Sequence, residues 1–459
     1  MTLQAGVPVD RSRLPEPGPA RLFRFPPIER SVLDSGLSVW SVTRPRSPVV
    51  TFLLLVRCGS AADPPGLEGL AATTADMLDE GSGALSAIGI HEALARIGAQ
   101  FDTDIGSDAI AASVTSLGRV ADRSLGLLAD IVARPALADA DFARVRELRQ
   151  HRLTQLRGNP GAVADRLFLR TLYGAHPYGH APGGGEASLA AMTGDDVRRF
   201  HARQIRPGAS TLIAVGDCAH DRIVALARAA FAGWDGAAPD PAGPDALPPQ
   251  PARLTIVPRA GAPQSELRIG EVGPPRDTPD YHALVAANMV LGGQFVSRVN
   301  LNLRERHGFT YGARTAFDFR RLPGPFSLQV SVQTDATIAA IREALGEIAD
   351  VRGPRPIGPA ELALGVAALT RGYARNFEAA EQIARAAMQL ALFRLPDDYF
   401  EQFVPRIEQV TPEIATAAMA RHVDPARLST LVVGDADRFH DALPSLDLGP
   451  AVVLPPDSF

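Results

Sequence analysis

Hydrophobic residues recur along the chain with two different periods, which predicts a mixture of strands and amphipathic helices. Segments 37–42 and 49–57 are rich in β-branched and apolar residues, as expected for a pair of strands joined by a proline-containing turn. Segment 360–392 has a helical composition with one break near Asn376. A further apolar stripe with helical spacing consists of Leu67, Leu70, Ala71, Met77 and Leu78. Strands that arrive together, with helices grouped between them, favour an α+β fold in which helices cover one face of an antiparallel sheet.

The two halves of the chain resemble each other. Residues 203–207 end at a proline and precede the strand-like run 213–217, which closes on Gly-Asp. Residues 421–425 and the run 431–435 repeat this pattern in the second half. A repeat of this length indicates two homologous domains rather than a solenoid.

A proline-rich segment separates the two halves. Residues 235–251 hold six prolines among Gly, Ala and Asp, a composition that sustains neither a helix nor a central strand. We therefore predict an N-terminal extension (1–29), a first domain (30–234), a linker (235–252), a second domain (253–447) and a C-terminal tail (448–459).

Composition excludes several classes of function. With 459 residues and a net charge of −5, the chain gives no reason to expect a nucleic-acid partner. All 46 basic residues are arginine, which excludes Schiff-base, P-loop and protein-kinase chemistry because each needs a lysine. Cys58 and Cys218 lie in separate apolar runs, and we expect two buried reduced thiols. We find no run of 18 apolar residues and no hydrophobic signal segment. We therefore expect no membrane insertion, and the compartment stays open between cytoplasm and periplasm.

Candidate chemistry is concentrated in segment 302–314, which reads N-L-R-E-R-H-G-F-T-Y-G-A-R. We predict a helix over 297–306 that stops at Gly308, followed by a strand over 309–317. Arg304 would then lie in the last helical turn and Tyr311 at the start of the strand, both able to face one cavity. An arginine near a helix C-terminus and a tyrosine in a strand also have ordinary structural roles, so the spacing alone leaves both interpretations open.

This segment resembles the Arg/Tyr substrate-binding motif in the second half of pitrilysin/insulinase-family zinc peptidases. The resemblance covers roughly residues 30–445 and implies two similar domains that face each other across a clam-like cavity. It also implies that Arg304 holds the peptide backbone through its forked donors. Tyr311 would donate a hydrogen bond to the oxyanion of the tetrahedral intermediate.

The first half lacks the metal motif that the resemblance calls for. The family carries H-x-x-E-H within a run like G-L-A-H-x-x-E-H-M-L-x-x-G, and residues 69–81 keep that frame. Ala72 and Asp76 stand where the histidines belong, and Ala75 stands where the catalytic base belongs. The family's third ligand is a glutamate on a later helix, and the matching region 142–157 places Gln150, His151 and Arg152 near that position. We therefore expect no zinc site of the family type.

The remaining histidines do not suggest another metal site. His91 begins a run like H-E-x-x-H, but Ala95 occupies the second histidine position, so we expect an exposed helix start. His176 and His180 are separated by Pro-Tyr-Gly, which predicts a turn rather than a helix face. His282 and His307 are isolated.

A possible peptide-binding edge lies at 100–104, which contains Phe101 and Thr103. It resembles the strand that, in active family members, lies beside the metal helix and receives substrate by β-addition.

We interpret the chain as the metal-free subunit of a heterodimeric zinc peptidase that cleaves peptides. An H-x-x-E-H family subunit would bring the zinc, and this chain would bring Arg304 and Tyr311 and be inactive alone. Two alternatives stay open. One is a non-catalytic scaffold of a larger complex, and the other is a homodimer that binds peptides without cutting them.

Overall fold

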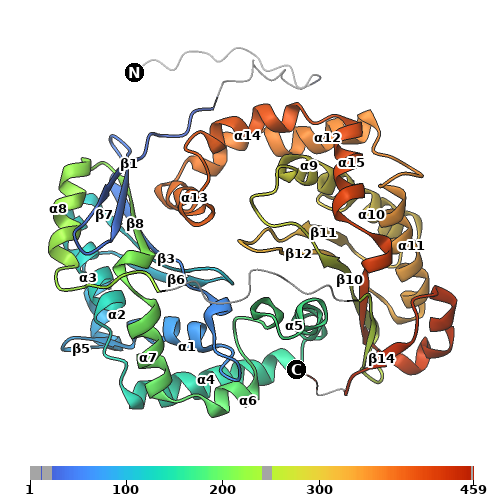
Figure 1. Cartoon of the computed structure of the whole chain (residues 1–459), viewed down its shortest axis with the longest axis horizontal. Helices are drawn as coiled ribbons and strands as arrows, with labels where there is room; N and C mark the ends of the chain where they lie inside the picture. The colour runs from blue at the N-terminus through green and yellow to red at the C-terminus, as the bar shows by residue number, and fades with distance from the viewer. Residues whose placement is uncertain (1–11, 13–22, 240–250, 456–457, 459) are drawn as a thin grey trace.

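The structure, a computed structural model, describes residues 12, 23–239, 251–455 and 458 and contains two six-stranded sheets (Figure 1). The first sheet has the order β1 (Glu29–Val32), β2 (Ser38–Thr43), β8 (Ser210–Gly216), β3 (Val49–Val56), β7 (Ile110–Leu117) and β6 (Gln100–Ile105). The second has the order β14 (Ala451–Val453), β9 (Leu254–Pro258), β13 (Ser429–Gly434), β10 (Gln264–Val272), β12 (Pro325–Gln333) and β11 (Ala313–Phe317). A short hairpin is formed by β4 (Gly81–Ser82) and β5 (Leu85–Ser86).

The repeated segments take the same place in both sheets. Strand β8 lies between β2 and β3, parallel to the first and antiparallel to the second. Strand β13 lies in the same way between β9 and β10. Most of the linker, residues 240–250, lies outside the described residues, and the segment expected as a C-terminal tail contributes β14 to the second sheet.

Two predictions about the sheets were wrong in detail. Segments 37–42 and 49–57 are strands β2 and β3, but they do not pair with each other because β8 lies between them. The sheets are therefore mixed rather than antiparallel. A strand that returns after a long helical connection can join its neighbour in parallel, which the local sequence around a turn does not reveal.

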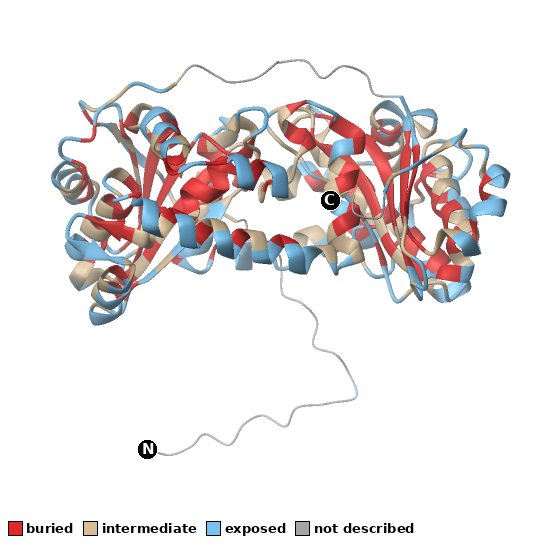
Figure 2. Cartoon of the chain, turned by 90° about the horizontal axis from the view of Figure 1, so that it is seen from below, coloured by how far each residue is buried: buried red, intermediate tan, exposed pale blue. Residues whose placement is uncertain are grey.

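Helices cover the outer face of each sheet, and Figure 2 shows buried residues concentrated in and beside the sheets. The helices of the first half are α1 (Leu70–Asp76), α2 (Ala87–Arg96), α3 (Ala121–Ala133), α4 (Asp139–Arg157), α5 (Pro160–Tyr173), α6 (Glu186–Ala191), α7 (Gly194–Gln204) and α8 (His220–Ala230). Those of the second half are α9 (Tyr281–Leu291), α10 (Arg298–Asn300), α11 (Thr337–Asp350), α12 (Pro359–Thr370), α13 (Ala380–Phe393), α14 (Tyr399–Glu408) and α15 (Pro412–His422). The break predicted near Asn376 separates α12 from α13.

The two halves exchange one helix each. Helix α5, from the first half, packs on β10 and β13 of the second sheet. Helix α13, from the second half, packs on β3 and β8 of the first sheet. Apolar residues bury both contacts, with Leu167 of α5 in one cluster with Leu431, and Ile383 of α13 in another with Leu55 and Ile213. Each exchanged helix packs on the central strands of a sheet and covers only part of its inner face. In the second sheet α5 leaves the side towards β11 uncovered.

A cavity of about 340 Å³ lies between the halves. The turn after β6 and His180 line it from the first half, and Phe319, Arg320 and Leu392 line it from the second. None of the described helices is long and apolar enough to cross a membrane. Cys58 is buried and Cys218 is partly buried, and both are free thiols.

Candidate functional site

Helix α1 carries the positions that the sequence analysis matched to the family's metal helix. It begins after Gly69, which has a positive φ of 98°, a conformation that glycine adopts without steric cost. The carboxylate of Asp63 accepts hydrogen bonds from the backbone N–H groups of Gly69 at 2.7 Å and Ala71 at 2.6 Å. These bonds satisfy donors that a helix start leaves open. Ala72 and Ala75 are buried, so neither position presents a polar atom to a ligand.

An ion pair occupies the position that the resemblance to the family predicts for the metal. Asp76, at the end of α1, forms an ion pair with Arg149 of α4, with 2.8 Å between Oδ2 of Asp76 and Nη2 of Arg149. Nη1 of Arg152 lies 3.6 Å from the same carboxylate oxygen. The prediction for the third position named Gln150, His151 and Arg152. Arg152 lies near Asp76, but the closest group is Arg149, one residue before the predicted set. A guanidinium between the two helices repels a metal cation, so these residues do not fit zinc.

The described residues offer no other metal centre. Within them, no group of three or more His, Cys, Asp or Glu side chains could hold a metal ion. His91 lies on α2, largely exposed, and has Asp79 3.5 Å away. His176 and His180 flank the short 3₁₀ turn Pro177–Gly179, as the sequence predicted, and neither lies on a helix face.

Burial strongly perturbs one carboxyl next to this position. The side chain of Asp63 has no exposed surface. Burial raises the pKa of Asp63 to about 7, although the two backbone hydrogen bonds and the nearby Arg149 oppose the shift. The nearby Glu68 raises the pKa further by its negative charge. Asp63 is therefore a buried acid that titrates near neutrality and shares its surroundings with the Asp76–Arg149 pair.

The expected peptide-binding edge is an edge strand of the first sheet. Strand β6 pairs only with β7 and lies beside α1. Phe101 is half-buried against the first core, and Thr103 lies on the same face of the strand. A peptide added here would bond to the backbone of β6 rather than to these side chains. The opposite face carries Asp102 and Asp104, which pair with Arg385 of α13 at 3.6 and 3.4 Å.

The Arg/Tyr segment differs from the prediction at both of its elements. The helix over 297–306 is present, but it consists of α10 followed by a π-helix, Leu301–Arg306. Gly308 ends it with a φ of +66°. The strand begins at Ala313 instead of 309, so Tyr311 precedes it in a turn.

Side chains explain the late start of this strand. The amide of Asn300 donates to the carbonyl of Ala313 at 2.7 Å and accepts from its N–H at 2.9 Å. The N–H of Gly312 donates to the hydroxyl of Thr310 at 3.1 Å. Because the backbone groups here bond locally, the segment around Tyr311 is a turn rather than a strand.

Arg304 and Tyr311 present very different surfaces. The guanidinium of Arg304 stacks on the ring of Phe295, with its carbon 3.8 Å from the centroid, and contacts Glu305 at 3.3 Å. Its Nη1 atom is buried and has no hydrogen-bond partner among the described residues. Tyr311 is 94% exposed, which is unusual for a large ring, and its hydroxyl has no partner among the described residues. The hydroxyl of Tyr311 is an accessible donor that a bound ligand could satisfy, whereas the unused Nη1 donor of Arg304 is enclosed.

The metal-helix counterpart and the Arg/Tyr segment belong to opposite halves. Helix α1 lies in one half and α10, which leads into Arg304, lies in the other (Figure 1). Helix α1 contacts α4, α7 and β6, all from the first half. The two predicted site clusters therefore come from different domains of this chain.

Comparisons with known proteins agree with this architecture. The model for "Insulinase (Peptidase family M16)" matches residues 38–182, and the model for "Peptidase M16 inactive domain" matches residues 191–368. The fold and the matches define a two-domain peptidase-type protein of the pitrilysin/insulinase class. The chain belongs to peptidase family M16.

Relatives and solved structures cover nearly the whole chain. An uncharacterized zinc protease of Streptomyces coelicolor is 25% identical over 91% of this chain and 92% of its own length. One from Mycobacterium tuberculosis is 25% identical over 88% of this chain and 92% of its own. The crystal structure of a peptidase M16 inactive domain from Pseudomonas fluorescens has a TM-score of 0.84 at 24% identity, covering 89% of this chain and 98% of that one. A protease structure from Helicobacter pylori also gives 0.84, at 19% identity, covering 90% and 100%. At these identities the solved structures show the fold alone.

Proposed function

We propose that this chain is the metal-free subunit of a two-chain zinc peptidase and contributes Arg304 and Tyr311 to a site completed by a partner. The partner would carry H-x-x-E-H and its zinc, which activates a water molecule when bound. This chain would hold the peptide backbone and stabilise the oxyanion. The family membership and the zinc proteases among the relatives support a role in proteolysis.

The single observation behind this proposal is the asymmetry between the two halves. The first half has Ala72, Ala75 and the Asp76–Arg149 pair in place of metal ligands. The second half retains Arg304, whose Nη1 donor is buried without a partner among the described residues, and Tyr311, which is almost fully exposed. A tyrosine ring so exposed contributes little to folding, so its value would lie in contact with another molecule. A scaffold subunit has no such need for Tyr311.

The decisive experiment mixes this chain with an H-x-x-E-H family protein from the same genome. Hydrolysis of a quenched fluorescent peptide is measured for each chain alone and for the mixture, with and without a zinc chelator. We expect zinc-dependent activity only in the mixture, and a loss of roughly 10²–10³-fold with Tyr311→Phe, the cost of removing one oxyanion donor. Arg304→Gln should also reduce activity, whereas Arg306→Gln, an exposed arginine two residues away, serves as the matched control.

Other outcomes would reject the proposal. Zinc-dependent hydrolysis by this chain alone would show that it does not depend on a partner. Activity in the mixture that is indifferent to Tyr311→Phe would remove the proposed role of the motif. A stable complex without peptidase activity would favour the scaffold.

A further inference from the structure

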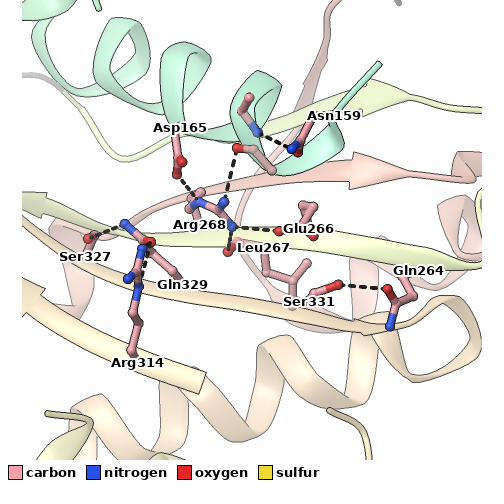
Figure 3. Close-up of polar contacts among 12 residues, drawn as sticks. Asn159, Asp165, Gln264, Glu266, Leu267, Arg268, Arg314, Ser327, Gln329 and Ser331 are labelled. Carbon is pink, nitrogen blue, oxygen red and sulfur yellow. Dashed lines mark hydrogen bonds and ion pairs between the residues drawn. The ribbon is translucent and has the colours of Figure 1, made fainter. Parts of the chain in front are cut away.

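The uncovered part of the second sheet's inner face is polar. Strand β12 directs Phe326, Leu328, Val330 and Val332 into the second core. Its alternate residues, Ser327, Gln329, Ser331 and Gln333, face the other way because side chains in a strand alternate between faces. Three of the side chains on this face form a row across the sheet, since Gln329 of β12 is in register with Arg314 of β11 and with Arg268 of β10 (Figure 3).

Arg268, at the covered end of the row, has a structural role. It is buried, and its guanidinium pairs with Asp165 of α5 at 2.6 Å and with Glu266 at 3.1 Å. It also donates to the carbonyl oxygen of Gly161 at 3.2 Å. Its positive charge is compensated, and its contacts tie the exchanged helix α5 to the second sheet (Figure 3).

Arg314, at the open end of the row, is held without being neutralised. Its Nε and Nη2 atoms both donate to Oε1 of Gln329, at 3.0 and 2.6 Å. The amide of Gln329 is fixed in turn, because its Nε2 donates to the hydroxyl of Ser327 at 3.3 Å. Across residues 23–239 and 251–455, no carboxylate lies within 4.0 Å of the guanidinium nitrogens of Arg314. The opposite edge of the guanidinium, with one N–H of Nη1 and the second N–H of Nη2 lying parallel, remains available for a planar anion.

This arginine lines a pocket beside the Arg/Tyr segment. The pocket has a volume of about 460 Å³ and is also lined by Gln329, Glu266, Phe295 and Gly312. Phe295 is the ring that covers Arg304, and Gly312 follows Tyr311 directly. Of the ionisable residues lining the pocket, Glu266 pairs with Arg268, which also pairs with Asp165 outside the lining, whereas Arg314 is a cation with no carboxylate partner among the described residues.

We propose that this pocket binds a carboxylate of the peptide substrate, with Arg314 as the binding residue and Gln329 as the residue that positions it. The inference rests on the proposed function, because it assumes that a peptide lies against Arg304 and Tyr311. A guanidinium with a free pair of parallel donors matches the two oxygens of a carboxylate. The carboxylate could belong to an Asp or Glu side chain or to the C-terminus of a short peptide.

Binding to the full chain alone tests this without a partner or a metal. The probes are N-terminally fluorescein-labelled nonapeptides of Ala and Ser with a central Asp or Asn, each with a free or an amidated C-terminus. Fluorescence anisotropy gives the dissociation constants. We expect the carboxylate-bearing probe to bind about five- to tenfold more tightly than its neutral counterpart, the effect of one charge-assisted pair in a partly exposed site. The internal and terminal arms identify which carboxylate is selected.

Variants separate a specific site from general charge attraction. Arg314→Gln should abolish the preference, and Gln329→Leu should reduce it because the guanidinium is no longer held. Arg123→Gln, on the exposed side of α3, removes the same charge elsewhere and should leave the preference intact. Equal affinity for acidic and neutral probes, a preference that survives Arg314→Gln, an equal loss in Arg123→Gln, or no binding of any probe would each overturn the proposal.

Failure here is distinguishable from failure of the proposed function. If the mixture with a zinc-carrying partner depends on Tyr311 while the probes show no preference for a carboxylate, the peptidase role stands and the Arg314 site does not. If the probes show an Arg314-dependent preference while the mixture is inactive, the chain binds acidic peptides without cutting them.

Discussion

Arg149 and Asp76 join α4 to α1 by an ion pair of 2.8 Å, at the position that the sequence motif predicts for the metal of this family. Asp76 is one-third exposed, whereas the side chain of Arg149 is 10% exposed. Asp76 also has Arg152 at 3.6 Å as a second cation. Loss of Asp76 would leave Arg149 as an unpaired buried charge, whereas loss of Arg149 would leave Asp76 partly solvated. The two residues therefore depend on the ion pair to different degrees.

This inequality predicts asymmetric effects on stability. Asp76→Ala should cost about 1–3 kcal/mol of unfolding free energy, because it leaves a buried guanidinium unpaired. Arg149→Met should cost less, since Asp76 is partly solvated and retains Arg152. Urea unfolding of both single variants and the double variant gives the coupling energy. The mostly exposed pair Glu92–Arg96 is the matched control, with an expected coupling of about 0.5 kcal/mol or less. Equal effects of the two single variants would contradict this interpretation.

Restoring zinc binding should require the removal of Arg149. The double variant Ala72→His and Asp76→His should place two imidazoles on one face of α1, but the guanidinium of Arg149 would still repel the ion. Adding Arg149→Glu supplies a third ligand in place of that charge. We expect zinc affinity to rise at least about 100-fold from the double to the triple variant, given the preference of zinc for three protein ligands. Competition with a chromophoric chelator measures it. Equal affinities would show that Arg149 does not occupy the ligand position.

The sequence predicted the two-domain α+β fold because the information is local and repeated. The pattern that ends at Gly216 in the first half recurs at Gly434 in the second, and both segments became the strand that runs parallel to its neighbour. The pairing of β2 with β8 was not predictable from the turn between β2 and β3. Likewise, no local pattern shows that α5 and α13 each pack on the sheet of the other half.

The sequence names candidate residues for the site but does not predict their contacts. The family motif located Arg304 and Tyr311, and the structure tests neither role. The motif could not show that Phe295 covers Arg304, because that contact depends on the fold of the loop before α10. The predicted set did not include Arg149. Helix α4 consists mostly of polar residues, so the sequence alone does not show which of them face α1. Arg314 and Gln329 were predictable in part, since the alternation along β12 places polar residues on one face.

Asp63 should make the stability of the chain depend on pH between about 4 and 7. Its folded pKa is about 7, against an ordinary value of 3.8. As pH rises through this window the unfolded chain loses this proton first, so the folded state binds more protons and its stability falls. The full effect is roughly 4 kcal/mol at 1.36 kcal/mol per pKa unit. Asp63→Asn removes this group, so the stability of the variant relative to the wild type should rise with pH.

Other groups that titrate between about pH 4 and 7 contribute equally to the wild type and to Asp63→Asn, so their contributions cancel in the stability difference. Burial also raises the pKa of Glu271 to about 7, which adds a fall in stability with pH. Burial lowers the pKa of His282 to about 4, which has the opposite sign. Both groups are unchanged in Asp63→Asn. Urea unfolding of the wild type and the variant at several pH values gives the difference directly. A constant difference from pH 4 to 8 would show that Asp63 does not titrate with a raised pKa.

Substitutions of Arg268 and Arg314, the two arginines of the row across the second sheet, should have different effects: the first on stability and the second on binding. Arg268→Gln removes the cation that compensates Asp165 and Glu266 and that ties α5 to β10, so we expect a loss of about 2–4 kcal/mol. Arg314→Gln removes an exposed side chain bonded to a neutral amide, and its effect should stay within about 0.5 kcal/mol. Thermal and urea unfolding of both variants measures this difference. Because the two positions lie on either side of Gln329, a comparable loss in Arg314→Gln would assign it the same structural role as Arg268. A stable Arg314→Gln variant that no longer distinguishes acidic from neutral peptides would place the function of this residue in binding alone.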